Sequence, residues 1–411
     1  MATVTDEPRL DVTPGGRALD DPAPDETRAG SRRQRRRQRR ARRRWVVIVP
    51  SVFVVLIVLT VIGAQLRSGT TGRPTRAAPA ATNVPPVRGA PTMLLAHRAA
   101  DGRVDLAALV GVQRGGHDGS VLLVPTLTAL EVPSFELQLV ADLLNLGPPS
   151  LLQTTISNVL GVRIDQTVVL DDAQLVDALA PAGSLTVDLR DPVNLAGGTE
   201  PRTIEAGTQS FAPADAAALL TNPGSAGELE HLVTVQAVLE GWMHALRTPS
   251  VATATTARVP AFSTLVAAAH ASTDYATLPV DGVSAGAGER YQVREDAIGP
   301  AAKGAFPDAL LGIGGERPRV EILNGTGVVG LVQQVAGVVV PAGGDVVQTG
   351  NYTGFGQTVT RVVYYRDSQR AAATALLRAL RTGQLAREQK DIQVFDVTII
   401  VGSDFKAPPG T

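Results

Sequence analysis

Two charged residues at the entrance of a predicted strand are the first candidates for chemistry. The segment Asp101-Gly-Arg-Val-Asp105 leads into the apolar run from Leu106 to Val112. A carboxylate at a strand edge can hold Mg²⁺, and an arginine beside it can neutralise a pyrophosphate. Arg103 and Asp105 are therefore candidate ligand-binding residues, and Asp105 is also the candidate metal ligand. A solvated turn before a strand explains the same pattern, and the pattern alone favours that simpler interpretation.

A glycine-rich turn before a predicted helix is the second candidate. Asn324, Gly325, Thr326 and Gly327 precede an apolar helical segment that starts at Val328. Helix N-termini bind anions, so a phosphate or sugar-phosphate site is conceivable here. The motif is too short for a Walker loop and lacks the spacing of a dinucleotide fingerprint. Asn-Gly is ordinary turn chemistry, which favours a structural role.

Other catalytic patterns are missing from the sequence. There are no cysteines, which excludes disulfides, thiolate zinc sites and cysteine nucleophiles. No H-E-x-x-H or G-x-S-x-G motif occurs, so no residue is assigned a catalytic role and no cofactor is expected. The five histidines show no metal-binding spacing and are explained by turns, packing or solvent: His97, His117, His231, His244 and His270.

The elements that carry these residues follow a predicted membrane anchor. Residues 45–66 form an uncharged apolar stretch that is long enough to span a bilayer. A dense arginine run directly precedes it, and the positive-inside rule then places the N-terminus in the cytoplasm. The orienting arginines are Arg35, Arg36, Arg37, Arg39, Arg40, Arg42, Arg43 and Arg44. The sequence thus predicts a single-pass plasma-membrane protein, with the bulk of the chain extracytoplasmic and membrane lipid as one partner.

Charge supports this division of the chain. The formal net charge is −1, yet ten arginines lie between Arg32 and Arg44, and the chain from Arg67 onward sums to −7. The arginine run could also serve as a nucleic-acid arm, because it would release counterions from phosphates equally well. Its place beside the membrane favours the orientation signal, and no nucleic-acid partner is expected. Hydrophobic residues make up 44% of the chain, which excludes a wholly disordered protein.

We expect six segments: a disordered basic tail (1–44), the transmembrane helix (45–66), a linker (67–91), an α/β domain (92–248), a connector (249–315) and a C-terminal domain (316–406). In the α/β domain the periodicity predicts strands over 106–112, 121–124, 167–170 and 185–189. It predicts helices over 135–146 and 151–160, a helix capped by Asp171 or Asp172 that runs through Leu179, and a long helix over 229–246. The connector has only weak periodicity, with one helical segment expected over 262–271. The fold class is therefore α/β or α+β.

The C-terminal segment has the clearest pattern. Strands over 319–323, 345–349, 359–365 and 395–401 alternate with helices over 328–340 and from about 367 to 381. This β-α-β-β-α-β order is the split βαβ plan.

This C-terminal block resembles the LytR C-terminal domain. The resemblance rests on Val320-Glu-Ile-Leu-Asn-Gly-Thr-Gly, on a V-x-Y-Y strand, and on Asp396-Val-Thr-Ile-Ile-Val-Gly-Ser-Asp-Phe405. The part before it looks like a diverged LytR-CpsA-Psr domain, because Gly102-Arg-Val-Asp105 matches that family's G-R-x-D strand. Ala206-Gly-Thr-Gln209 and Gly227-Glu-Leu-Glu-His231 resemble two later motifs of the family. Members of the family transfer glycopolymers from a polyprenyl-pyrophosphate lipid to peptidoglycan, with Mg²⁺ on the pyrophosphate.

The departures from this family decide the expected function. Where the family carries Pro-Arg-Asp, this chain has Pro125-Thr126-Leu127, and His231 replaces a late arginine. Only Arg103 and Asp105 carry over cleanly. Transfer from a pyrophosphate needs several cations, so we expect a degenerate, non-catalytic relative. It would bind cell-wall glycopolymer, polyprenyl lipid or envelope proteins. The alternative is an active phosphotransferase that uses Arg103, Asp105 and Mg²⁺. A basic pocket near Asp105 would favour that alternative.

Overall fold

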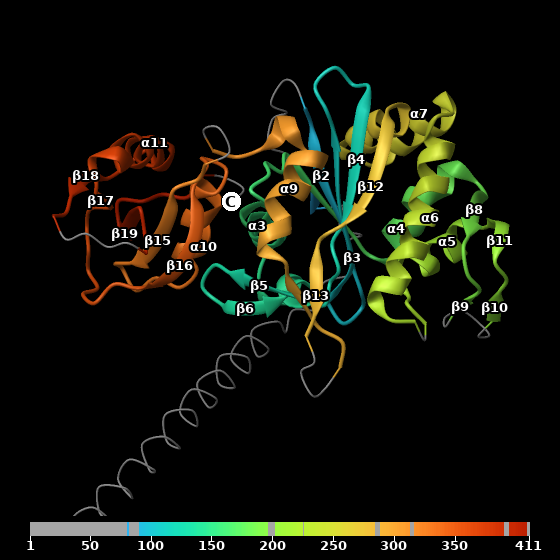
Figure 1. The fold of residues 1–411 in the computed structure, drawn as a ribbon, viewed down its shortest axis with the longest axis horizontal. Coiled ribbons are helices and arrows are strands. Elements are labelled where there is room, and N and C mark those ends of the chain that lie inside the picture. The colour runs from blue at the N-terminus through green and yellow to red at the C-terminus, as the bar shows by residue number, and fades with distance from the viewer. Residues whose placement is uncertain are drawn as a thin grey trace, which may run out of the picture. The chain divides into compact units, whose positions relative to one another are not determined.

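The structure, a computed structural model, describes residues 80–81, 90–195, 202–224, 226–283, 288–312, 316–389 and 394–408. These residues belong to one compact unit, 77–411 (Figure 1). The predicted tail, membrane span, orienting arginines and most of the linker lie outside the described residues. Within the ranges just given, no helix is both long and apolar enough to cross a membrane.

A six-stranded sheet forms the centre of the fold. Its strand order is β1-β7-β2-β3-β4-β12, and it is mixed: β2 pairs antiparallel with β3 and parallel with β7. The strand bounds are β1 Ala80–Ala81, β2 Thr92–Arg98, β3 Val104–Val112, β4 Asp118–Leu123, β7 Gln166–Leu170 and β12 Ser272–Thr277. The predicted strands over 106–112, 121–124 and 167–170 are confirmed, and so is the mixed α/β class.

Helices cover both faces of this sheet (Figure 1). One face packs against α4 Asp172–Leu179, α5 Pro213–Thr221, α6 Glu228–Leu246, α7 Pro249–Arg258 and α8 Ser263–His270. The other packs against α2 Leu143–Leu146, α3 Pro149–Leu160 and α9 Glu295–Ala305. The first face is tightly filled: Trp242 is fully buried and meets Phe262 edge to face at 5.5 Å. Burial of side chains this large is the main stabilising term of the fold.

Local sequence signals set several helix ends as predicted. Asp171 accepts a hydrogen bond from the Gln174 backbone N–H, which completes a capping box for α4. Helix α3 ends at Gly161, whose φ of 63° favours glycine. The predicted long helix over 229–246 is α6.

The strand predicted over 185–189 is β8 Leu185–Leu189, which pairs with β11 Gly207–Phe211. A second short ribbon joins β9 Val193–Leu195 to β10 Arg202–Ile204.

The helix predicted over 135–146 is wrong in its first part. Residues Glu136–Leu139 form strand β6, which pairs antiparallel with β5 Thr128–Val132, and a 3₁₀ turn (Val140–Asp142) and the short α2 follow. Strands β13 Val280–Gly282 and β14 Tyr291–Val293 complete this four-stranded sheet. Residues Glu136–Leu139 pair with β5 although their apolar residues have helical spacing. The contacts across the two strands come from residues outside the short stretch of sequence in which that spacing is read.

The expected connector, 249–315, is built into the main fold. It contributes α7, α8 and α9, and its strand β12 pairs parallel with β4 at the end of the six-stranded sheet. Phe262 and Leu265 from this segment are buried in the core. The segment is rich in alanine and threonine, whose small side chains give weak apolar periodicity even where they are packed.

The C-terminal segment contains a five-stranded sheet in the order β16-β15-β19-β17-β18. The bounds are β15 Arg319–Asn324, α10 Leu331–Val339, β16 Asp345–Asn351, β17 Arg361–Tyr364, α11 Arg370–Leu380, β18 Gln384–Arg387 and β19 Val397–Val401. All six predicted elements are present, and β18 is an addition. Helices α10 and α11 contact each other and cover one face of the sheet.

The split βαβ plan is wrong for this sheet. In a split unit another strand separates the two parallel strands. Here β15 pairs directly with β16, and β17 pairs directly with β18. The last strand, β19, lies between the two units, parallel to β15 and antiparallel to β17. All five residues of β19 are buried, which explains the central position.

Candidate functional site

A β-bulge sets the position of Asp105. Strand β3 pairs with β2 so that His97 faces Leu106 and Arg98 faces Val104, which leaves Asp105 as the extra residue. Leu106 belongs to the core on the α6 side of the sheet, whereas Val104 belongs to the core on the opposite side. A bulge re-aims side chains in this way. It brings the Asp105 carboxylate to His97.

His97 is held between two carboxylates. Its Nδ1 lies 2.7 Å from Asp105 Oδ1, and its Nε2 lies 3.3 Å from Asp172 Oδ1 at the start of α4. The side chain of His97 is only 1% exposed, whereas that of Asp172 is 75% exposed. The second contact is an ion-pair distance without hydrogen-bond geometry, so Nε2 has no hydrogen-bond partner among the described residues. The arrangement fixes the orientation of a buried imidazole between two carboxylates.

A second histidine, His231, lies close enough to Asp105 for the aspartate's negative charge to affect its pKa. His231 is buried on α6, and burial lowers the pKa of its ring, while a hydrogen bond to the Leu220 backbone and the negative charge of Asp105 oppose that shift. The ring therefore binds a proton less readily than an exposed histidine does. Its Nε2 is buried without a hydrogen-bond partner in the described part of the chain. Such an atom beside a cavity indicates a place for a ligand group or water.

Arg103 is directed to another partner. Its Nε lies 3.1 Å from Asp142 Oδ1, and its backbone N–H donates to Asp101 Oδ1 at 2.9 Å. The two residues that carry over from the family motif therefore engage different groups: Asp105 contacts a histidine and Arg103 contacts an aspartate. Both side chains of the Arg103–Asp142 pair are about 40% exposed, so the contact is a weak one.

A buried glutamate lies where the family resemblance places Pro-Arg-Asp. The backbone N–H and the hydroxyl of Thr126 both donate to Glu228 Oε1, and the Leu127 N–H donates to Glu228 Oε2 at 3.0 Å. Burial raises the pKa of Glu228, and the hydrogen bonds from Thr126 and Leu127 only partly offset this. The carboxylate of Glu289 lies nearby and accepts from the Glu228 backbone N–H. Two backbone donors that could face an anionic ligand are thus occupied by a carboxylate of the chain itself.

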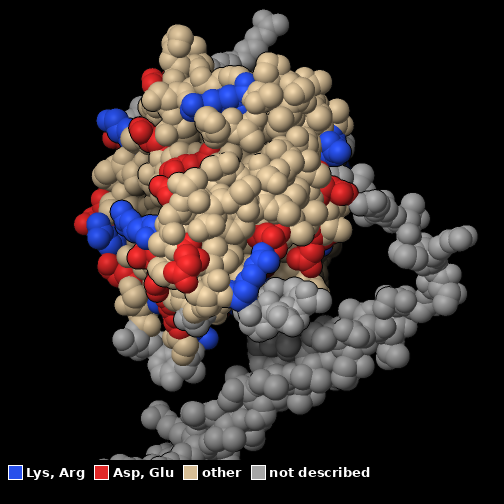
Figure 2. Space-filling view, turned by 90° about the vertical axis from the view of Figure 1, so that its right-hand side faces the viewer, with Lys and Arg blue, Asp and Glu red and all other residues tan. Residues whose placement is uncertain are grey.

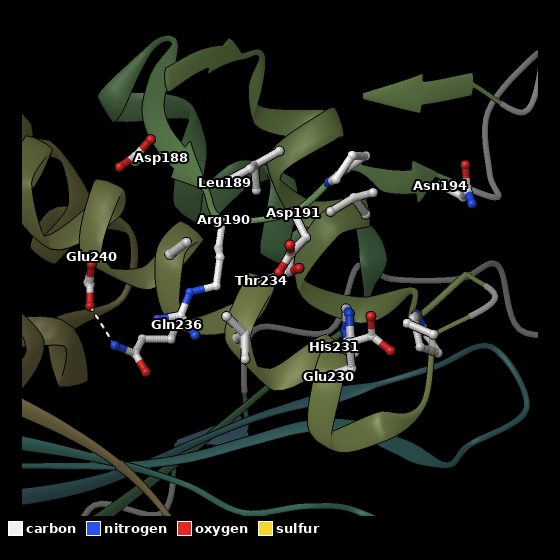
Figure 3. A pocket seen from close by; sticks show the side chains of 16 residues that line it. Asp188, Leu189, Arg190, Asp191, Asn194, Glu230, His231, Thr234, Gln236 and Glu240 are labelled. Atoms are coloured by element: carbon white, nitrogen blue, oxygen red, sulfur yellow. Dashed lines mark hydrogen bonds between the residues drawn. The ribbon is translucent and has the colours of Figure 1, made fainter. Parts of the chain in front are cut away.

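A cavity of about 550 Å³ opens beside His231, between α6 and the link from β8 to β9 (Figure 3). Arg190 reaches from this link toward the helix, and Gln236 Nε2 donates to Glu240 Oε1 at 2.8 Å. Four carboxylates line the cavity against this one arginine: Asp188, Asp191, Glu230 and Glu240. An acidic cavity repels a pyrophosphate, whereas carboxylates accept hydrogen bonds from sugar hydroxyls.

Asp105 would hold Mg²⁺ only together with oxygens of a bound pyrophosphate and water, which is the usual way proteins bind this ion. Its Oδ1 is engaged by His97. Among the residues that the structure describes, no three His, Asp or Glu side chains are grouped to hold a metal ion.

The Asn324–Gly327 turn is organised by its own asparagine. Asn324 Oδ1 accepts from the Thr326 and Gly327 backbone N–H groups at 3.0 Å, and its Nδ2 donates to the Val328 carbonyl at 2.8 Å. A Cβ on Gly325 would lie 2.6 Å from the Val401 carbonyl oxygen, so only glycine fits there. Helix α10 starts at Leu331, later than predicted. The turn is a built structural element, with Asn324 and Gly327 lining a separate cavity.

The histidines are what the sequence reasoning missed. His97 and His231 are 134 positions apart, and each lies alone in an apolar segment. The signal that could have found His97 is its place opposite the Gly102–Asp105 motif across a short hairpin.

Residues 317–405 match the family described as LytR cell envelope-related transcriptional attenuator, which confirms the predicted C-terminal domain. No curated protein matches the chain. Among solved structures, B. subtilis TagV is 12% identical with a TM-score of 0.47, covering 54% of this chain and 98% of TagV. B. subtilis TagU is 15% identical with a TM-score of 0.42, covering 55% and 99%. TagT bound to LI-WTA is 12% identical with a TM-score of 0.45, covering 57% and 98%.

Proposed function

We propose that this chain is a membrane-anchored extracytoplasmic protein of the cell envelope that binds a cell-wall glycopolymer without transferring it. The observation that carries the proposal is the excess of carboxylates where a pyrophosphate enzyme needs cations. Glu228 occupies the backbone donors of Thr126 and Leu127, and the cavity beside His231 carries four carboxylates and Arg190. Developing negative charge at a phosphorus centre would be opposed there instead of stabilised.

The same side chains suit a polyhydroxylated ligand. Asp188, Asp191 and Glu230 offer hydrogen-bond acceptors to sugar hydroxyls, and Arg190 offers donors to a ring oxygen or an isolated phosphodiester. His231 also lines this cavity. The match of residues 317–405 to a cell-envelope family supports this setting. The anchor and its orientation are proposed from the apolar stretch 45–66 and the arginines before it.

The surface charge favours the same class of partner. On the face drawn in Figure 2, basic and acidic side chains alternate around a broad neutral area, and the described residues form no continuous basic patch there. Nucleic-acid binding depends on such a patch to neutralise phosphates. We therefore propose glycopolymer, with polyprenyl lipid or envelope proteins as further partners, and no nucleic acid.

The test uses the full-length chain with polyprenyl-pyrophosphate-linked saccharide, a peptidoglycan acceptor and Mg²⁺. We expect no cleavage of the pyrophosphate bridge, and therefore no free polyprenyl monophosphate, but saturable binding of the free glycopolymer. The double variant Asp191→Asn with Glu230→Gln should weaken binding by about tenfold, since two acceptors are replaced by amides. Clear turnover that is lost in Asp105→Ala would overturn the proposal.

That outcome would support the second candidate, an active phosphotransferase. The observation in its favour is the Asp105–His97 pair, because a carboxylate that orients an imidazole is the usual support of a general base. In that case Asp105→Ala and His97→Gln should lose activity together, whereas Arg103→Gln should matter less because Arg103 already pairs with Asp142.

A further inference from the structure

A second cavity, of about 780 Å³, shares no residue with the one beside His231. Its walls are the β5–β6 hairpin, the Asn324–Gly327 turn and strand β16. Glu131 and Glu136 are the charged residues among those that line it, and both are exposed. The cavity therefore carries negative charge and no positive charge of its own.

Strand β16 borders this cavity with an open backbone edge. It is the outermost strand of the five-stranded sheet. The Tyr352 N–H donates to the Asn324 carbonyl of β15, so the alternation of a parallel ladder directs the N–H groups of Asn351 and Thr349 outward. An edge of this kind is a template for one more strand.

The start of the same edge is already paired by a side chain that imitates a strand. The Asn158 amide, from α3, donates to the Val346 carbonyl at 2.9 Å and accepts from the Val346 N–H at 3.0 Å. Farther along, the Ser134 N–H donates to the Thr349 hydroxyl, which leaves the Thr349 backbone unused by that contact. The protein thus pairs one end of the edge and leaves the part that faces the cavity open.

Large apolar side chains surround this open part. Leu137 is 62% exposed, Val329 is 96% exposed and Phe355 is 59% exposed, and all three line the cavity. The hairpin opposite is strained, because Ser134 and Glu136 have φ values of 74° and 58° without being glycine. Strain of this kind is retained at binding sites more often than elsewhere.

We propose that this cavity binds an extended basic peptide segment of a partner protein, which pairs with the β16 edge at Thr349–Asn351. Its lysine or arginine side chains face Glu131 and Glu136, and its apolar side chains contact Val329 and Phe355. Main-chain pairing provides affinity, and the alternating side chains provide specificity. The inference concerns a different surface from the proposed glycopolymer cavity, so either one can fail without the other.

The test measures the fluorescence anisotropy of a labelled short peptide of alternating lysine and valine on titration with the full-length chain. The double variant Glu131→Lys with Glu136→Lys should weaken binding by about tenfold or more. Glu205→Lys, at an exposed glutamate that does not line the cavity, is the matched control and should leave binding unchanged. The same peptide with alternate backbone nitrogens methylated should also bind about tenfold more weakly, because strand pairing needs those N–H groups.

A variant that changes no charge tests the apolar contacts separately. Val329→Ser, at a 96% exposed position, should weaken binding of the valine-containing peptide while the circular dichroism spectrum is unchanged. Equal binding by all variants would overturn the proposal. So would binding of a chito-oligosaccharide that competes with the peptide and is lost in Phe355→Ala. A concentration-dependent dimer that the double charge reversal abolishes would assign the cavity to a second copy of the chain and would also overturn it.

Discussion

His97 Nδ1 and Asp105 Oδ1 lie 2.7 Å apart because Asp105 is the extra residue of a bulge in β3. Without the bulge, alternation along the strand would place Asp105 on the opposite face of the sheet from His97. A one-residue irregularity therefore decides which group the family-like aspartate contacts.

Asp105→Asn should lower the free energy of unfolding by about 1–3 kcal/mol, since it replaces the charged partner of a buried imidazole. Urea denaturation of the full-length chain, followed by circular dichroism, measures the change. Asp172→Asn is the matched control, because Asp172 is 75% exposed, and it should cost less than about 0.5 kcal/mol. Equal losses in the free energy of unfolding would show that the Asp105–His97 contact stabilises the fold no more than the exposed Asp172 does.

The pH dependence of stability should carry the signature of Glu228. Burial raises the pKa of its carboxyl in the folded state, so the folded state binds the proton more readily than the unfolded state. Its contribution to stability is therefore largest at acidic pH and is lost as the pH rises through the raised pKa. Relative to Glu228→Gln, the wild type should gain stability when the pH is lowered from 7 toward the ordinary carboxyl range. Urea denaturation of both proteins at two pH values tests this. A wild type whose free energy of unfolding falls relative to that of the variant on acidification would contradict it.

Asp396 should show the opposite sign. Burial raises the pKa of Asp396, but hydrogen bonds from Arg319 and Gln369 outweigh burial and lower it. Its contribution is present above the unfolded pKa and is lost as the pH falls through the lowered one. Asp396→Asn should therefore destabilise the chain by about 1–3 kcal/mol at pH 7 and by less in acid. If the cost of this substitution were the same at both pH values, the charge of Asp396 would not be the cause.

Asn158→Ala should expose the start of the β16 edge. The variant removes both hydrogen bonds to Val346 and leaves its buried backbone groups unpaired, at a cost of about 1–3 kcal/mol. Hydrogen exchange measured by mass spectrometry should be faster in residues 345–349 than in the wild type. Asn145→Ala serves as the control, because the Asn145 amide makes only a 3.5 Å contact to the Asp101 carbonyl. Unchanged exchange in Asn158→Ala would mean that the amide does not hold the strand.

Local signals in the sequence determined the elements more reliably than their partners. The capping box at Asp171 and Gln174, the stop at Gly161 and the apolar face of α6 were each predictable, since they depend on residues within one or two turns. The first part of the helix predicted over 135–146 was wrong because β5 pairs with those residues. In 249–315 the helix expected over 262–271 is α8, whereas the weak periodicity gave no sign of α7 and α9.

Arg103 and Asp105 were identifiable as candidates from the sequence, but their roles were not. Asp105 contacts His97 through a bulge that no spacing rule reveals, and Arg103 is paired with Asp142, 39 positions away. His231 was noted only as the residue that replaces a late arginine of the family, and packing or solvent was taken to explain it. Its relation to Asp105 exists only because α6 covers the face of the sheet on which the bulge places that carboxylate.

By itself the sequence determined the charge division of the chain, the loss of the family's Pro-Arg-Asp at 125–127, and a C-terminal domain recognisable from the succession of its elements and its terminal motif. Only the tertiary structure decided which group lies at 126–127 instead. Glu228 reaches the backbone of Thr126 and Leu127 across about a hundred residues, and β19 inserts between two βαβ units. The spacing of apolar residues along an element indicates which of its faces is buried, because the residues on that face recur at the helical or strand period. It does not record which distant element covers that face, because that choice depends on the sum of contacts over the whole fold.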